Sequence, residues 1–258
     1  MRVVSLGDSF SCGAGVGLRL PLADTWVGRL TAALSGADHV PLATAGARTA
    51  DVRHAQLPAA LAAAPDLATL AAGLNDVTRA GFDGAVTRAD LLHVVAALRG
   101  TGARVLLVRL HDPTTVLPLP GSLRRAVQAR MVQVNAAVEE AARMPGVVLV
   151  DLGAVGALRL RGAWAVDRMH PSAAGHAAIA WSAARALRQS GQRVQPVRRV
   201  TAGELPADPG LVAEMAWLLR HGLPWLASHS RQVGAPLLSM AARGLPAQTV
   251  AEPVPLAS

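Results

Sequence analysis

A serine near the amino terminus is the first side chain placed where it could act as a nucleophile. Ser9 follows an apolar run, residues 3–6, that is typical of a short buried strand, and a glycine-rich segment, residues 13–17, comes soon after it. Open α/β sheets bind ligands beyond the carboxyl ends of their strands, where backbone N–H groups are free because the chain turns toward a helix. Ser9 is therefore a candidate nucleophile whose attack on a carbonyl would produce an oxyanion. A serine in such a turn more often has only a structural role in the turn.

An aspartate and a histidine far along the chain could activate this serine. A serine nucleophile needs a base that takes its proton, and the base needs a group that fixes its tautomer and stabilises the imidazolium. Asp167 and His170 are three residues apart, just before an alanine-rich helical pattern. Within one turn both side chains can face the same direction and meet. Together with Ser9 they predict a Ser-His-Asp triad.

Two other loops offer hydrogen-bond donors for an oxyanion. Gly46, in the small-residue loop 44–49, offers an unobstructed backbone N–H, and Asn75, in the loop 73–76, offers a side-chain amide. With the N–H of Ser9 they predict a three-donor oxyanion hole, in which the loss of one donor typically costs ~2.7–4 kcal/mol of barrier. These donors favour acyl transfer through a tetrahedral intermediate.

Alternating strand and helix patterns predict how these loops are positioned. The predicted strands are residues 3–6, 39–43, 67–72, 104–110 and 147–150, and the predicted helices are residues 24–34, 51–64, 87–98, 123–143 and 173–187. This alternation predicts parallel βαβ units with helices on both faces of the sheet. Pro41 favours an edge position for the second strand, and Pro58 is expected to break the second helix.

The blocks that carry these residues resemble the GDSL/SGNH hydrolases, a family of lipases and esterases. The blocks are Gly7-Asp8-Ser9, Gly46, Gly73-x-Asn75-Asp76 and Asp167-x-x-His170-Pro171, and their order and broad spacing match the family over about residues 1–188. The resemblance implies that Ser9 is the nucleophile, His170 the base and Asp167 its orienting partner. It also implies an oxyanion hole made of the Ser9 N–H, the Gly46 N–H and the Asn75 amide.

The resemblance also implies the fold class. That fold is a flavodoxin-like three-layer α/β/α sandwich with a parallel five-stranded sheet, which agrees with the strand and helix pattern. One departure lies in the second block, where the family often has an asparagine ahead of the glycine and residues 41–45 of this chain read PLATA. The G-x-S-x-G elbow of α/β-hydrolases is not matched, because Ser11 stands where the second glycine would be.

The composition excludes several kinds of chemistry. The chain contains no lysine, no tyrosine and a single cysteine, Cys12. A Walker A lysine, a Schiff base, a Ser-Lys dyad and a multi-cysteine zinc site are therefore excluded. No H-E-x-x-H or comparable cluster occurs, so neither a metal nor a cofactor is expected. The net charge is +8, but the arginines are scattered and aromatic residues make up only 3%, which argues against a nucleic-acid partner.

The sequence predicts neither a signal peptide nor a membrane span. The first residues lack the apolar region of a signal peptide, and no apolar run reaches ~18 residues. We therefore expect a cytoplasmic protein without a membrane span, whose partner is a small-molecule ester substrate. The oligomeric state stays open.

A change of composition after Gln189 predicts a boundary near Ser190. We expect a hydrolase domain at residues 1–190, followed by an arginine- and proline-containing linker and a helical extension at residues 191–258. Residues 211–226 form the most apolar part of that extension, and Pro224 is expected to end or kink its helix.

The apolar positions of this helix suggest how it packs. Leu211, Met215, Leu218 and Leu219 share one stripe, which we expect to be buried against the hydrolase domain. The competing interpretation is an interfacial membrane helix. It is disfavoured because the helix contains one basic residue and carries Glu214 among its apolar positions.

Four other titratable side chains belong to the same blocks or lie close to them. Asp8 and Asp76 are expected to hold turns through backbone hydrogen bonds, and His176 is expected to be structural. His111, at the carboxyl end of the fourth strand, is an alternative base that can line the pocket, but only the adjacent Asp112 is available to orient it.

We therefore predict a serine hydrolase that cleaves carboxylic esters through an acyl-enzyme intermediate. Thioesters and carbohydrate O-acetyl esters are alternative substrates within the same chemistry. A nucleotide or phosphate binder is disfavoured, because Gly13-x-Gly15-x-x-Leu18 lacks the third glycine of the dinucleotide fingerprint. A catalytically silent binding module would not require the triad.

Overall fold

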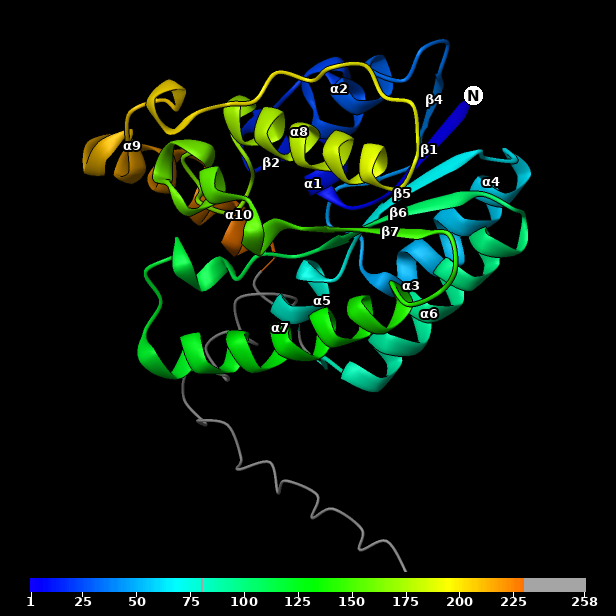
Figure 1. The fold of residues 1–258 in the computed structure, drawn as a ribbon. Coiled ribbons are helices and arrows are strands. Elements are labelled where there is room, and N and C mark those ends of the chain that lie inside the picture. The colour runs from blue at the N-terminus through cyan, green and yellow to red at the C-terminus, as the bar shows by residue number, and fades with distance from the viewer. Residues whose placement is uncertain (80, 230–258) are drawn as a thin grey trace, which may run out of the picture.

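A five-stranded parallel sheet forms the centre of the computed structural model, which describes residues 1–79 and 81–229 (Figure 1). Its strands are β1 (Arg2–Gly7), β4 (Asp38–Pro41), β5 (Leu67–Ala71), β6 (Arg104–Arg109) and β7 (Val147–Asp151), in the spatial order β4-β1-β5-β6-β7. Counted along the chain, the five strands of the sheet thus have the order 2-1-3-4-5 of flavodoxin-like folds. The predicted fold class is confirmed, and β4 with Pro41 lies at the sheet edge as expected.

Helices cover both faces of this sheet (Figure 1). One face carries α2 (Trp26–Ala32) and α8 (Ala173–Gln189), and the other carries α4 (Leu57–Ala62), α6 (Gly84–Gly100) and α7 (Gly121–Ala141). Successive strand residues therefore enter different cores: Leu106 packs into the cluster beneath α2 and α8, whereas Leu107 packs into the cluster beneath α4 and α6. Because both faces are covered, β1, β5 and β6 are largely apolar and lack a polar alternation, whereas the edge strand β4 is only partly buried.

The shorter elements lie mainly beyond the carboxyl ends of the strands. They comprise α1 (Ser9–Cys12), α3 (Thr49–Asp51), α5 (Leu74–Thr78), the hairpin of β2 (Ala14–Gly15) and β3 (Leu18–Arg19), and 3-10 turns at Leu22–Asp24, Pro113–Thr115, Leu152–Ala154, Gly156–Arg159, Arg161–Ala163 and Ala202–Glu204. The glycine-rich segment after β1 thus becomes a small antiparallel hairpin.

Pro58 does not break the helical segment in which it lies, so that prediction is wrong. The chain runs from α3 through a π-helical turn, Val52–Gln56, directly into α4, and Pro58 occupies the first turn of α4. A proline in a regular helix lacks a donor and clashes with a carbonyl one turn earlier, and the wider π turn relieves both problems. A second π turn, Leu218–Gly222, precedes Pro224 in the same way, and the helix continues into α10 (Leu223–Ser228).

The segment after α8 returns across the molecule to the carboxyl ends of the strands. Its first part packs against α2, where the N–H of Gln195 donates to the carbonyl of Ala33. It then leads to α9 (Gly210–Trp217) and α10, which lie beyond the carboxyl ends of the sheet in Figure 1. The rest of the predicted extension, residues 230–258, lies outside the described residues. None of the helices in the described ranges combines the length and hydropathy needed to cross a bilayer.

The predicted packing of this extension is wrong. Leu211 is 78% exposed, Leu219 is 62% exposed and Met215 is 53% exposed, so the apolar stripe faces away from the domain. The side of α9 that faces the domain carries Glu214, which pairs with two arginines, and Trp217, whose indole N–H donates to a backbone carbonyl. These polar contacts determine the orientation of the helix. The spacing of its apolar residues along the sequence gives no sign of such contacts.

Candidate active site

Ser9, His170 and Asp167 form one continuous hydrogen-bonded chain, although Ser9 and His170 are 161 residues apart in sequence. The Nε2 of His170 lies 2.9 Å from the Oγ of Ser9, and its Nδ1 lies 2.6 Å from the Oδ2 of Asp167. In the tautomer that donates Nδ1–H to the carboxylate, Nε2 is free to accept the serine proton. This is the arrangement that a base-activated serine requires.

The end of β1 places Ser9 at a helix start. Gly7 has φ +127°, and a Cβ there would lie 2.0 Å from the carbonyl oxygen of Ala71, so only glycine fits. Asp8 then caps α1 by accepting the N–H of Phe10 at 2.9 Å. Ser9 is the first residue of α1, and the first N–H groups of a helix have no intrahelical partner. Its N–H is therefore open to an oxyanion.

A tight loop places the base and its partner. The Oδ1 of Asp167 accepts the N–H groups of both Met169 and His170, each at 3.0 Å, while its Oδ2 receives the imidazole. Arg168, between them, has a left-handed backbone with φ +58°. The loop then closes through the carbonyl of His170, which accepts the N–H of Ala165 at 2.8 Å.

Burial and the two carboxylates around His170 act in opposite directions on its protonation. Burial alone would lower the pKa of His170, but the hydrogen bond and charge of Asp167, together with the charge of Asp8, raise it above the ordinary value. The pKa of Asp167 is lowered, because its bonds from His170 and from the loop N–H groups outweigh its own burial. Burial raises the pKa of Asp8 to about 6.

The loops that carry the expected oxyanion donors meet beside Ser9. The side-chain amide of Asn75 donates to the Oδ2 of Asp8 at 3.0 Å and to the carbonyl of Ala47 at 3.1 Å. It therefore lies between the residue before Ser9 and the residue after Gly46. Gly46 has φ +78°, and nothing crowds its Cα except one terminal nitrogen of Arg79, 3.7 Å from an added Cβ. Both amide protons of Asn75 are engaged, so donation to an oxyanion would replace one of these bonds.

The carboxylates and the histidine that were expected to be structural hold backbone in place. Asp76 accepts the N–H of Thr49 at 3.1 Å and its hydroxyl at 2.8 Å, which joins the third block to α3. His176 is fully buried and accepts the N–H of Trp26 at its Nδ1, 3.1 Å away. Burial lowers the pKa of His176 to about 3, so the ring stays neutral.

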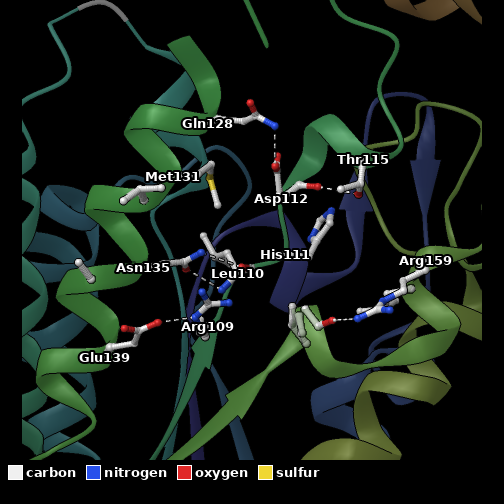
Figure 2. Close-up of a pocket in the computed structure, with 15 residues that line it drawn as sticks. Arg109, Leu110, His111, Asp112, Thr115, Gln128, Met131, Asn135, Glu139 and Arg159 are labelled. Carbon is white, nitrogen blue, oxygen red and sulfur yellow. Dashed lines mark hydrogen bonds and ion pairs between the residues drawn. The ribbon is translucent and has the colours of Figure 1, made fainter. Parts of the chain in front are cut away.

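His111 belongs to a different cavity. It lies at the end of β6 in the wall of a cavity of about 890 Å³, opposite Gln128, Met131, Asn135 and Glu139 of α7 (Figure 2). Its ring packs on Trp164 with the centroids 4.1 Å apart, and burial lowers its pKa to about 4. The carboxylate of Asp112 accepts from Thr114 and Gln128. The histidine that meets Ser9 is therefore His170.

A second cavity of about 400 Å³ adjoins Ser9 and His170. Its wall combines the β2–β3 hairpin, the chain before the Asp167–His170 loop and the segment that leads to α9. The lining includes Gly13, Gly15, Leu20, Trp164, Ala165, Val166, Pro206, Ala207 and Pro209. Apolar side chains and glycines predominate, so this cavity suits a small apolar group.

Two positions that support the site were not singled out from the sequence. Gln56, presented by the π turn, accepts the N–H of Gly7 at 2.8 Å and donates to its carbonyl at 2.9 Å, which fixes the end of β1. Gly15 lies against the imidazole, because an added Cβ would be 3.0 Å from the Cγ of His170. In the sequence, Pro58 and the glycine-rich segment 13–17 were the local signals near these two positions. In residues 1–79 and 81–229, no group of three His, Cys, Asp or Glu side chains could hold a metal ion.

Comparisons with known proteins identify a matching family model and similar solved structures. The model of the GDSL-like lipase/acylhydrolase family matches residues 5–178. Among solved structures, TesA is 25% identical with a TM-score of 0.57, and the match covers 73% of this chain and 99% of TesA. A search of curated protein sequences found no match.

Two further solved structures share the fold at lower identity. The psychrotrophic esterase EstA from Pseudoalteromonas sp. is 18% identical with a TM-score of 0.56, over 73% of this chain and 97% of EstA. A catalytic mutant of Axe2, an acetylxylan esterase from Geobacillus stearothermophilus, is 21% identical with a TM-score of 0.57, over 78% and 97% of the two chains.

Proposed function

Because the chain belongs to the GDSL-like lipase/acylhydrolase family and is an ester-cleaving hydrolase, we propose that it cleaves carboxylic esters of small molecules through an acyl-enzyme formed on Ser9. The observation that carries this proposal is the 2.9 Å contact between the Ser9 hydroxyl and the Nε2 of His170, with Asp167 on the other ring nitrogen. A structural serine has no need of an oriented histidine.

The reaction begins when the Oγ of Ser9 attacks the carbonyl carbon of the ester. The hydroxyl proton passes to the Nε2 of His170, and Asp167 stabilises the imidazolium that results. The carbonyl oxygen becomes an oxyanion in a tetrahedral intermediate. The intermediate then expels the alcohol oxygen, which takes the proton from Nε2, and the acyl group remains on Ser9. Water repeats the attack with His170 as base, which releases the carboxylic acid and restores the serine.

Three donors would stabilise the oxyanion: the N–H of Ser9, the N–H of Gly46 and the amide of Asn75. Preorganised donors contribute most where charge develops in the transition state. The amide of Asn75 would exchange its hydrogen bond to Ala47 or to Asp8 for one to the oxyanion. Its net stabilisation of the transition state is therefore the strength of the new bond minus that of the bond it gives up.

The cavity beside Ser9 favours esters with a short apolar substituent. Its volume of about 400 Å³ lies toward the lower end of the ~300–1,000 Å³ that is typical of small-molecule pockets, and its mostly apolar lining leaves few partners for sugar hydroxyls. Simple short-chain carboxylic esters are therefore our first candidates. Thioesters and carbohydrate O-acetyl esters are the alternatives.

A substrate panel tests the proposal directly. p-Nitrophenyl esters of graded acyl length, an acyl thioester and acetylated xylose would be assayed with the full-length protein and with Ser9→Ala. We expect the highest kcat/KM for short acyl esters and no turnover by Ser9→Ala. A fluorophosphonate probe should label only the peptide that contains Ser9, and labelling that persists in Ser9→Ala would contradict the acyl-enzyme.

A further inference from the structure

Arg168 occupies a strained position inside the catalytic loop. Its φ of +58° is left-handed, a conformation that costs free energy at every residue except glycine, and among the described residues Ala64 is the only other non-glycine with positive φ. In this conformation the chain turns so that the N–H groups of Met169 and His170 both reach Asp167. The geometry of the dyad therefore depends on a backbone state that arginine does not favour by itself.

The side chain of Arg168 is held by partners outside the loop. Its Nε and Nη2 donate to the carboxylate of Glu214 on α9, at 2.9 Å to Oε1 from Nε and at 2.6 and 2.8 Å to the two oxygens from Nη2. Its Nη1 donates to the carbonyl of Val116 at 3.1 Å. The guanidinium is thus fixed on two sides, and a bidentate pair of this kind restricts both direction and distance.

The same carboxylate holds a second arginine on the other side of Asp167. The Nη2 of Arg161 lies 3.0 Å from the Oε1 of Glu214, and its guanidinium also donates to three consecutive backbone carbonyls, those of Trp164, Ala165 and Val166. The side chain of Arg161 is 13% exposed and that of Glu214 is 17% exposed. Glu214 therefore joins the chain before Asp167 to the chain after it, in a partly desolvated site.

Helix α9 also contacts the β2–β3 hairpin, which packs against His170. The indole N–H of Trp217 donates to the carbonyl of Val16 at 2.9 Å, and the neighbouring Gly15 packs against the imidazole ring. The apolar stripe of Leu211, Met215, Leu218 and Leu219, which runs from α9 into the following π turn, is exposed instead. The contacts of α9 with the domain thus converge on the elements that flank the catalytic histidine.

We propose that Glu214 is a positioning residue for ester hydrolysis: by pairing with Arg168 and Arg161, it holds the Asp167–His170 loop in the conformation that presents His170 to Ser9. The inference rests on the proposed function of Ser9, His170 and Asp167. It assigns the segment after α8 a part in the active site, although that segment lies beyond the residues matched by the family model, 5–178.

Glu214→Gln in the full-length protein is the first test. The amide keeps the shape of the side chain but removes the charge that pairs with both arginines. Glu214 supplies the only carboxylate paired with Arg168 among the described residues, so we expect kcat to fall about tenfold with KM within about twofold of wild type. The matched control is Glu204→Gln in the same segment, whose carboxylate bonds Arg198 and Thr201 and does not contact the loop. This control should keep the wild-type kcat.

The variants Arg168→Gly and Arg168→Ala distinguish a positioning role from a general contribution to stability. Glycine adopts the left-handed conformation without strain, so Arg168→Gly should retain more kcat than Arg168→Ala. The double variant Glu214→Gln with Arg168→Gly should likewise have a higher kcat than the double variant Glu214→Gln with Arg168→Ala. Equal kcat for the glycine and alanine variants, or a Glu214→Gln variant that melts lower with an unchanged kcat, would overturn the proposal.

A readout that does not depend on turnover keeps this test separate from the proposed function. The Nδ1–H proton of His170, shared with Asp167, should give a far-downfield proton NMR resonance in wild type that weakens or shifts in Glu214→Gln and stays unchanged in Glu204→Gln. An unaltered resonance in Glu214→Gln contradicts the positioning role. A wild-type protein that hydrolyses none of the esters contradicts the proposed function, whatever the resonance does.

Discussion

The amide of Asn75 and the carboxylate of Asp8 are joined by a hydrogen bond of 3.0 Å, which ties the loop 73–76 to the residue directly before Ser9. The bond fixes the amide close to the start of α1, where the N–H of Ser9 is open. It also engages one of the two protons that the amide can offer. For the proposed oxyanion hole, this bond therefore positions the Asn75 amide and at the same time occupies one of its protons.

Replacement of Asn75 should affect kcat far more than KM. In Asn75→Ala the transition state loses a donor whose bond strengthens mainly as charge develops, so we expect kcat to fall by roughly 10²–10³. The measurement is steady-state kinetics on a short-chain ester. A change confined to KM would mean that Asn75 binds the ground-state substrate instead.

The pH dependence of kcat/KM should report His170. The ring must be neutral to accept the proton of Ser9, and its pKa is raised above 6.5 because Asp167 and Asp8 outweigh the effect of burial. Activity should therefore rise with pH through a midpoint above 6.5. Asp167→Asn removes the main raising influence while burial remains, so the midpoint should move to lower pH, and kcat should fall by about 10⁴. A wild-type midpoint well below 6.5 would contradict this assignment.

Replacement of Gly15 by alanine should displace the imidazole of His170. The added Cβ would lie 3.0 Å from both Cγ and Nδ1 of His170 and 3.4 Å from the Oδ2 of Asp167, so the imidazole has to shift. We expect Gly15→Ala to lower kcat roughly ten- to hundredfold, the scale associated with small misplacements of a catalytic group. Gly156→Ala is the control, because nothing lies within 4 Å of a Cβ at that position. Equal kcat in the two variants would show that the ring tolerates the contact.

Removal of the Gln56 side-chain amide should destabilise the end of β1. In Gln56→Leu the buried N–H of Gly7 loses its acceptor, whereas the carbonyl of Gly7 keeps the N–H of Thr44. One buried unpaired donor costs about 1–3 kcal/mol, so the free energy of unfolding in denaturant should fall by about that amount. Gln128→Leu, at a half-buried position with side-chain partners only, should cost less than Gln56→Leu. A Gln56→Leu variant as stable as wild type would mean that another group satisfies Gly7.

The sequence by itself determined the layered fold. Continuous apolar strands alternating with helical patterns allow few arrangements other than a parallel sheet covered on both faces, because each strand buries both of its sides. Pro41 indicated the edge strand for an equally local reason, since proline has no backbone N–H to donate to a neighbouring strand. The three-residue spacing of Asp167 and His170 likewise made their contact predictable, because one turn brings both side chains together.

Only the tertiary structure decided which distant groups meet. The contact of Ser9 with His170, and not with His111, depends on loops that close across the sheet edge. The continuation of the helix past Pro58 depends on a π turn whose Gln56 is held by Gly7. The apolar stripe of residues 211–219 predicts the wrong buried face for α9. A carboxylate paired with two arginines, 46 and 53 residues away, decides that face instead, and no local periodicity encodes such long-range partners.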